Sequence, residues 1–124
     1  MTLIIGGAYQ GKRALAKKLC GLSDEDIYVC TGEEIDFSRR CIAGLEKFTY
    51  ACAARHTSAV EYFRRHRDAW ADSVLLCEDM SGGVVPLGAD MRAWREENGR
   101  LCAYLAAEAE RVSRVFCGLE QRLK

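Results

Sequence analysis

The sequence predicts a single α/β domain over residues 1–124, with a mostly parallel sheet of about four to five strands and helices on both faces. Apolar runs suited to strands alternate along the chain with segments that repeat apolar residues at helical spacing. A glycine-rich loop joins the first of these strands to the first helix. Residues 73–77 form a continuous apolar run, which is typical of a strand buried on both faces of a parallel sheet.

The first half of the chain is expected to hold two strands and three helices. The strands are 2–6 and 27–30, and the helices are 11–20, 36–55 and 59–69, with a polar connection at 22–26 and a break at 56–58. The longest of these helices is predicted from five apolar residues at helical spacing, namely Phe37, Cys41, Leu45, Phe48 and Cys52.

The second half is expected to begin with the strand at 73–77, followed by a loop at 81–86 that contains the only proline, Pro86. A helix is predicted over 89–111 from one face that carries Met91, Trp94, Asn98, Leu101, Leu105, Ala109 and Val112. A last strand is predicted at 112–117, with a continuation through 118–123. We find no internal repeat, low-complexity tract or linker, so the sequence predicts one domain.

The composition argues against several classes of protein. Hydrophobic residues make up 49% and charged residues 29% of the 124 positions, a balance typical of a folded domain. The 18 basic and 18 acidic residues give a net charge of zero, which argues against a general nucleic-acid-binding protein. The apolar runs are too short to span a bilayer, and residues 1–5 lack the charged leader of a signal peptide. We therefore expect a cytoplasmic protein that binds neither nucleic acid nor membrane.

Seven cysteines are spread along the chain without a Cys-x-x-Cys pair. This spacing argues against a zinc site, and the odd number argues against a disulfide framework. We expect most of these cysteines to pack as small apolar side chains, with a metal or redox role as the alternative.

The strongest functional signal lies between the first strand and the first helix. Glycines and a lysine occur in the order Gly-x-x-x-x-Gly-Lys over the segment Gly6, Gly7, Ala8, Tyr9, Gln10, Gly11 and Lys12. In a phosphate-binding P-loop the glycines let several backbone N–H groups point at one anion, and the start of the helix adds to this field. Lys12 would reach the outer phosphates of a bound GTP or ATP. An ordinary glycine-rich turn is the alternative interpretation.

The residue after Lys12 departs from this motif. A P-loop has serine or threonine there, whose hydroxyl helps to hold Mg²⁺, whereas this chain has Arg13. A guanidinium has hydrogen-bond donors but no acceptor, so Arg13 argues against bound Mg²⁺ while it still counts among the residues beside the nucleotide.

A second candidate group follows the strand at 73–77. Glu78 and Asp79 come directly after this run, and ligands bind at the carboxyl ends of the strands in open α/β sheets. A carboxylate at such an end supports Mg²⁺ or its waters in phosphate-transferring sites. Glu78 and Asp79 are therefore candidate metal ligands, and Asp79 is a candidate catalytic residue beside Lys12. Acidic residues are also common at strand ends without such a role.

Two stretches of this chain carry a family resemblance. Ile4-Ile5-Gly6-Gly7-Ala8 with Gly11-Lys12 forms the first, and the stretch from Asp79 to Pro86 forms the second. Further matches follow in order at Arg95, Gly99-Arg100, Leu105-Ala106, Val112 and 118–124. This pattern resembles the adenosylcobinamide kinase/adenosylcobinamide-phosphate guanylyltransferase family, whose motifs are Gly-Gly-Ala-x-x-Gly-Lys-Ser and Glu-Val-Gly-x-Gly-(Ile/Val)-Val-Pro. The resemblance covers residues 1–20 and 73–124.

The resemblance implies a P-loop domain of the RecA-like type and a role in assembling the nucleotide loop of cobalamin. Members of the family phosphorylate the aminopropanol arm of a corrinoid and then transfer GMP to it from GTP. A nucleoside triphosphate and a corrinoid are therefore the expected partners. A homo-oligomer is also expected, because full-length members of the family assemble.

The chain departs from the family in its motifs and in its length. Arg13 replaces the P-loop serine, Asp79 replaces a glutamate, and Ser81 replaces a glycine. The chain is shorter between the second strand and position 73, where full-length members carry the histidine that becomes guanylylated.

Two histidines are candidates for that catalytic role. His66 lies among arginines and just before Trp70, a context similar to that of the family, although its offset from the next strand differs. A solvated helix face is the alternative explanation of this cluster, and His56 is expected at the surface.

Three functions remain open from the sequence. The first is an active, shortened corrinoid kinase or guanylyltransferase. The second is a relative that has lost one or both activities and acts as a nucleotide or corrinoid sensor or accessory protein. The third, without the resemblance, is an unrelated small P-loop kinase. Guanine rather than adenine is expected from the resemblance alone.

Overall fold

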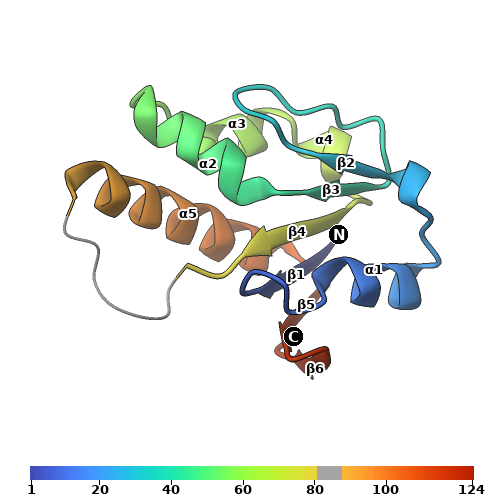
Figure 1. The fold of residues 1–124 in the computed structure, drawn as a ribbon. Helices are drawn as coiled ribbons and strands as arrows, with labels where there is room; N and C mark the ends of the chain where they lie inside the picture. The colour runs from blue at the N-terminus through green and yellow to red at the C-terminus, as the bar shows by residue number, and fades with distance from the viewer. Residues whose placement is uncertain (81–87) are drawn as a thin grey trace.

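The computed structural model describes residues 1–80 and 88–124 and contains one six-stranded sheet in the order β2-β3-β4-β1-β5-β6 (Figure 1). The strands are β1 Thr2–Gly6, β2 Ile27–Val29, β3 Cys41–Ala43, β4 Val74–Glu78, β5 Arg111–Phe116 and β6 Leu119–Arg122. The first five strands pair in parallel, and β6 pairs antiparallel with β5. The expected α/β class and mostly parallel sheet are confirmed, with six strands rather than four to five.

Strand β1 lies in the middle of the sheet, between β4 and β5. Its last residue, Gly6, is in register with Glu78 of β4 and with Val115 of β5. Because these three strands are parallel, their carboxyl ends meet at one edge of the sheet. The segments that follow them therefore meet at that edge.

Helices cover both faces of the sheet, as expected. They are α1 Lys12–Cys20, α2 Leu45–Ala54, α3 Ala59–Arg65, α4 Arg67–Trp70 and α5 Ala89–Glu108, with one short 3₁₀ turn at Asp24–Asp26. Helix α1 packs on one face through Leu15 and Ala16, and the other four helices share the opposite face (Figure 1). Within residues 1–80 and 88–124, no helix combines the length and the apolarity needed to cross a membrane.

The larger of the two cores is aromatic. Phe48, Phe63 and Trp70 are fully buried between α2, α3, α4 and the sheet, and the indole nitrogen of Trp70 donates to the Phe63 carbonyl at 2.7 Å. Burying one such ring contributes about 2–3 kcal/mol. The smaller core lies under α1 and contains Ile4 and Leu76.

The helix predicted over 36–55 is wrong in its first part. Cys41–Ala43 form the interior strand β3, whose three residues are all buried and which pairs with both β2 and β4. Gly44 then adopts a left-handed conformation (φ 72°), which ends the strand and begins α2 at Leu45. The helical spacing of Phe37 and Cys41 with the later apolar residues is therefore a coincidence of two different elements.

Other predicted boundaries also change. The helix expected over 59–69 is two short helices that meet at His66. The last helix ends at Glu108, so Ala109 and Val112 of its predicted face lie beyond it. Met91, expected in that face, is 42% exposed. The chain reverses at Cys117 and Gly118 (φ 52° and 75°), so the expected continuation of the last strand is a hairpin. The loop expected at 81–86 lies outside the described residues.

Candidate functional site

Residues 6–12, named here the glycine loop, connect β1 to α1 at the carboxyl edge of the sheet. A Cβ atom on Gly6 would lie 2.7 Å from the Val115 carbonyl oxygen, so β5 leaves no space for a side chain there. Gly11 has φ 100° and begins α1 without a side-chain cap. Backbone N–H groups in the first turn of a helix have no partner within the helix, and they attract anions.

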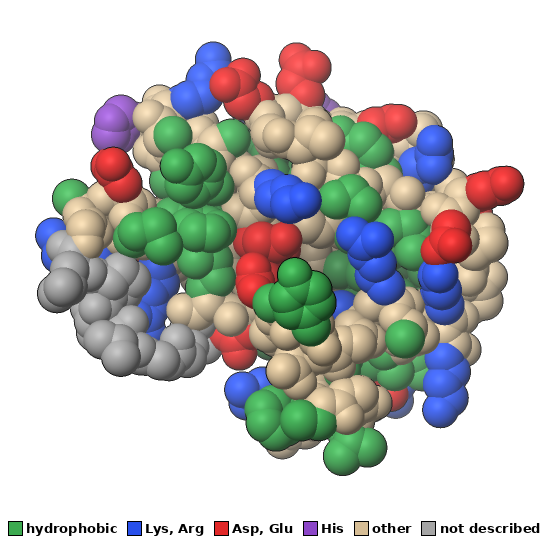
Figure 2. Space-filling view, in the orientation of Figure 1, with side chains coloured by type: hydrophobic (Ala, Val, Ile, Leu, Met, Phe, Trp, Pro, Cys, Tyr) green, Lys and Arg blue, Asp and Glu red, His purple; other side chains and the backbone are tan. Residues whose placement is uncertain are grey.

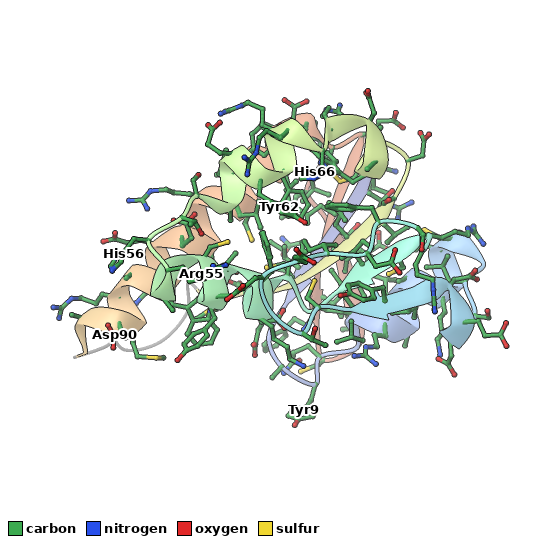
Figure 3. All side chains as sticks on the ribbon, turned by 90° about the horizontal axis from the view of Figure 1, so that it is seen from above. Tyr9, Arg55, His56, Tyr62, His66 and Asp90 are labelled. Carbon is green, nitrogen blue, oxygen red and sulfur yellow. The ribbon has the colours of Figure 1, made fainter. Side chains whose placement is uncertain are left out.

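The hairpin between β5 and β6 braces this loop. The Gly118 N–H donates to the Gln10 carbonyl at 2.9 Å, and the Cys117 N–H donates to the side-chain oxygen of Gln10. Nothing in the spacing of the sequence predicts this contact, because the two segments lie more than a hundred positions apart. The tip of the loop is Tyr9, a non-glycine residue with φ 59° whose side chain projects into solvent (Figure 3).

The side chain of Lys12 folds back over the glycine loop instead of extending into the solvent. Its ammonium donates to the carbonyl oxygens of Gly6 and Gly7 at 3.1 and 2.9 Å. The positive charge is therefore held at the mouth of the loop. To reach an outer phosphate, the ammonium would exchange these neutral carbonyls for charged oxygens, which form stronger hydrogen bonds.

A cavity of about 510 Å³ opens beside the glycine loop. Residues 8–14 form one wall, and the start of α2, with Glu46 and Lys47, forms the wall opposite. Its volume falls within the usual range for small-molecule sites. Both α1 and α2 begin at this cavity after left-handed glycines, and neither start is capped by a side chain.

The structure separates the two acids predicted at the end of β4. Glu78 lines the glycine-loop cavity, whereas Asp79 lines a different cavity, because successive residues of an extended chain face opposite sides of the sheet. The Asp79 carboxylate lies 3.6 Å from Arg114, and its backbone N–H donates to the Gly6 carbonyl at 2.8 Å. Asp79 is therefore tied to β1 through its backbone, while its side chain faces away from Lys12.

Glu46 is a site residue that the sequence reasoning missed. Its carboxylate lines the cavity and accepts the backbone N–H of Glu78 at 3.0 Å. Recognition of β3 would have identified it, since the segment after a parallel strand lies at the carboxyl edge. Because the sequence predicted one helix over 36–55, it indicated no strand before Glu46.

A buried polar network holds the end of β4 in place. Asn98 of α5 donates to the Glu78 carbonyl at 3.1 Å and accepts the hydroxyl of Thr49 at 2.8 Å and the thiol of Cys77 at 3.3 Å. Trp94 donates to the Glu46 carbonyl at 2.8 Å. The network therefore joins α5, α2 and β4 next to the cavity. The sequence placed Asn98 on the core face of its helix but gave it no role.

The described residues do not form a magnesium site on their own. Among residues 1–80 and 88–124, no cluster of three or more His, Cys, Asp or Glu side chains could hold a metal ion. Glu46 and Glu78 are the two carboxylates of the cavity, and one Glu46 oxygen already accepts a backbone N–H. Arg13 lines the same cavity and supplies no acceptor.

His66 lies far from the glycine loop. Its Nδ1 is 2.7 Å from the Tyr62 carbonyl, and its ring stacks on Phe37 with 5.6 Å between ring centroids. Figure 3 shows His66 beside Tyr62 and on the other side of the molecule from Tyr9. His56 is exposed between α2 and α3, and neither histidine lines the glycine-loop cavity.

The exposed charges have no single sign. On the face shown in Figure 2, Lys and Arg side chains are interspersed with Asp and Glu, as the net charge of zero would lead one to expect.

Comparison with known proteins adds no family. No family model matches the chain, and no curated protein matches it either. The resemblance described from its motifs therefore stays a prediction, and the site is defined by its geometry: a glycine loop with Lys12, at the carboxyl edge of a parallel sheet, facing Glu46 and Glu78.

Proposed function

We propose that this protein binds a nucleoside triphosphate through its phosphates at the glycine loop. The observation that carries the proposal is the placement of Lys12 and the uncapped start of α1 together, on a loop whose backbone is fixed by Gly6 and Gly11. An ordinary turn needs neither the lysine over its carbonyls nor a cavity in front of it.

The expected contribution of Lys12 follows from its contacts. In the unliganded loop its ammonium has two neutral acceptors, and a phosphate would replace them with charged ones. A charge-assisted hydrogen bond contributes about 1.5–3 kcal/mol, so Lys12→Ala should weaken triphosphate binding by about 10- to 150-fold.

Titration calorimetry with GTP, ATP, GDP and inorganic tripolyphosphate tests the proposal. Tripolyphosphate should bind, because phosphate recognition needs no base, and Lys12→Ala should lose affinity for all four. Lys18→Ala is the matched control, since Lys18 is exposed on the same helix and lies outside the cavity. Equal affinity of Lys12→Ala and the unmodified protein, or no binding of any of the four, would show that the loop is only structural.

The resemblance extends this proposal to a corrinoid as the acceptor, in the manner of adenosylcobinamide kinase/adenosylcobinamide-phosphate guanylyltransferase. Within it we assign Lys12 to the phosphates and Glu78 to the polar wall of the cavity. Asp79 and His66 receive no role at the loop, because Asp79 faces Arg114 and His66 packs among aromatic rings. Transfer of labelled phosphate from GTP or ATP to cobinamide would test the acceptor directly.

A second candidate function is a relative that binds nucleotide without transferring it, as a sensor or accessory protein. Arg13 favours this candidate, because it places a cation where a metal-binding hydroxyl would lie. Nucleotide affinity should then change little between zero and saturating Mg²⁺, and Arg13→Ser should introduce Mg²⁺ dependence. Incubation with labelled GTP should leave no GMP on the protein. A GMP adduct on His66 or His56 by mass spectrometry would instead support a guanylyltransferase.

A homo-oligomer fits this proposal. Phe116 and Leu119, on the β5–β6 hairpin at the edge of the sheet, are 64% and 73% exposed. Sedimentation at several protein concentrations would reveal such an assembly.

A further inference from the structure

Strand β6 is an open edge of the sheet. It comes last in the strand order, and within the described part of the chain no strand pairs with its outer side. The Leu123 N–H donates to the Val112 carbonyl of β5 at 2.8 Å. Alternate residues of an antiparallel strand direct their backbone groups to the same side, so Gln121 also faces β5. The backbone N–H and C=O groups of Glu120 and Arg122 therefore point outward.

The side chains of Glu120 and Arg122 lie on one face of β6 and carry opposite charges. The Glu120 carboxylate accepts hydrogen bonds from Arg111 and Ser113 of its own chain, and both end on Oε1. Its other oxygen, Oε2, accepts no hydrogen bond from a described residue. Arg122 donates from Nε to the Lys124 carbonyl at 3.0 Å and pairs with no acid among the described residues. Both charged groups can therefore take a further partner.

An open edge strand can pair with the same strand of a second copy, related to it by a two-fold axis. The outward backbone groups are matched when the axis lies at Glu120, Gln121 or Arg122. An axis at Glu120 brings two carboxylates together, and one at Arg122 brings two guanidiniums together. The axis at Gln121 instead places each Glu120 opposite Arg122 of the other copy. Opposite charges across antiparallel strands favour pairing and like charges weaken it, so the charges select this register.

The other face of β6 carries apolar side chains that suit the same register. Leu119 and its cross-strand neighbour Phe116 are large side chains that are mostly exposed. Figure 2 shows hydrophobic side chains at the end of the molecule where Figure 1 places β6. With the axis at Gln121, Leu119 lies opposite Leu123 of the other copy. Pairing would thus cover apolar surface on this face while it joins opposite charges on the other.

From the backbone, the charges and the apolar face together, we propose that two copies of this chain associate through antiparallel pairing of β6, with the two-fold axis at Gln121. The sheet then continues from one copy into the other. Charged residues on an edge strand can also prevent such pairing. Charges of one sign would do so here, whereas the order Glu120, Gln121, Arg122 is complementary to itself. The proposal gives the homo-oligomer suggested above a defined interface, and it does not depend on nucleotide binding.

Sedimentation equilibrium without nucleotide tests the association. The mass should rise with protein concentration from 13.9 kDa toward twice that value. Arg122→Glu places a carboxylate opposite Glu120 at both ends of the contact and should raise the dissociation constant of the dimer at least tenfold. Arg65→Glu is the matched control, because it makes the same charge change at an exposed position of α3, and it should leave the constant within twofold.

A cysteine at the axis tests the register. Residues opposite each other at the axis have Cα atoms within about 6 Å, which a disulfide can bridge. In a Cys117→Ser background, which removes the exposed native thiol, Gln121→Cys should form a disulfide-linked dimer on mild oxidation at least tenfold faster than Leu119→Cys. Leu119 lies opposite Leu123, so the two copies of position 119 are too far apart to be bridged.

Three results would overturn the proposal. The first is a monomer at every concentration up to the millimolar range. The second is an equal dissociation constant for Arg122→Glu and Arg65→Glu, which would place the contact between copies elsewhere. The third is equal crosslinking of Gln121→Cys and Leu119→Cys, which would exclude this register. Nucleotide binding at the glycine loop is measured separately, so loss of one proposal leaves the other standing.

Discussion

Asn98 offers the sharpest test of how the fold holds the site. Its side chain is 2% exposed and makes hydrogen bonds with the Glu78 carbonyl, the Thr49 hydroxyl and the Cys77 thiol. Asn98→Leu keeps a similar volume but removes all three. The two stronger bonds contribute about 1 kcal/mol each, and leaving the Glu78 carbonyl without this donor adds about 1 kcal/mol more. The expected loss in the free energy of unfolding is therefore about 3 kcal/mol.

Urea unfolding followed by tryptophan fluorescence measures this loss. With a urea dependence of about 2 kcal/mol per molar, typical of a chain of this size, the midpoint should fall by about 1.5 M. Thr49→Val should destabilise less, since the Asn98 donor remains on the Glu78 carbonyl. The double variant should show a coupling energy of about 1 kcal/mol between the two positions. A loss below about 1 kcal/mol for Asn98→Leu, or no coupling, would refute the idea that this network holds the end of β4.

Three further predictions address the loop, the thiols and the acid limit of stability. Gly6→Ala should lower the free energy of unfolding in urea by about 2–3 kcal/mol, because its Cβ would lie 2.7 Å from a backbone carbonyl oxygen of β5. A loss of less than about 0.5 kcal/mol would contradict this close approach of the two strands. With a thiol reagent at pH 8, exposed Cys117 should react at once, whereas Cys41, whose pKa burial raises to about 12, should react only after denaturation. A hydrogen bond from Arg111 lowers the pKa of Glu120 from its ordinary 4.5, so this carboxylate stabilises the fold above that value and loses its effect as the pH falls through the lowered one. Glu120→Gln should make stability fall less as the pH falls below about 4.5, and an unchanged slope would remove this residue from the acid transition.

The parts of the fold that were predictable are those where one local pattern decides the outcome. The apolar run 73–77 and the strand–glycine–helix order at residues 2–20 gave β4, β1 and α1 within one or two residues. A continuous apolar run of strand length is typical of a strand buried on both faces, and glycines permit the tight turn that joins a strand to a helix. These two pieces supply the glycine loop and Glu78 of the candidate site, while its opposite wall comes from α2.

The predictions that were wrong concern segments whose structure is decided by tertiary contacts rather than by the local spacing of apolar residues. Cys41 to Ala43 form only three residues of strand, too few for a period to show, and their partners lie in β2 and β4. The sequence indicates that Asp79 and Lys12 both lie at the carboxyl edge of the sheet. It does not indicate which face of the sheet each side chain takes. The bond between Gln10 and the hairpin, and the network of Asn98, join segments far apart in the chain. No local pattern contains such contacts.

The central position of β1 has a consequence for how the protein is made. β1 precedes the other five strands of the sheet in the chain, yet one neighbour begins at Val74 and the other at Arg111. While the ribosome adds about 5–20 residues per second, the apolar run of β1 waits for several seconds before both partners exist. A nascent chain stopped before β5 leaves one edge of β1 open to other chains and lacks the hairpin that braces the glycine loop. The geometry of the glycine loop is thus among the last features of the sheet to form, and chains stopped before β5 should aggregate.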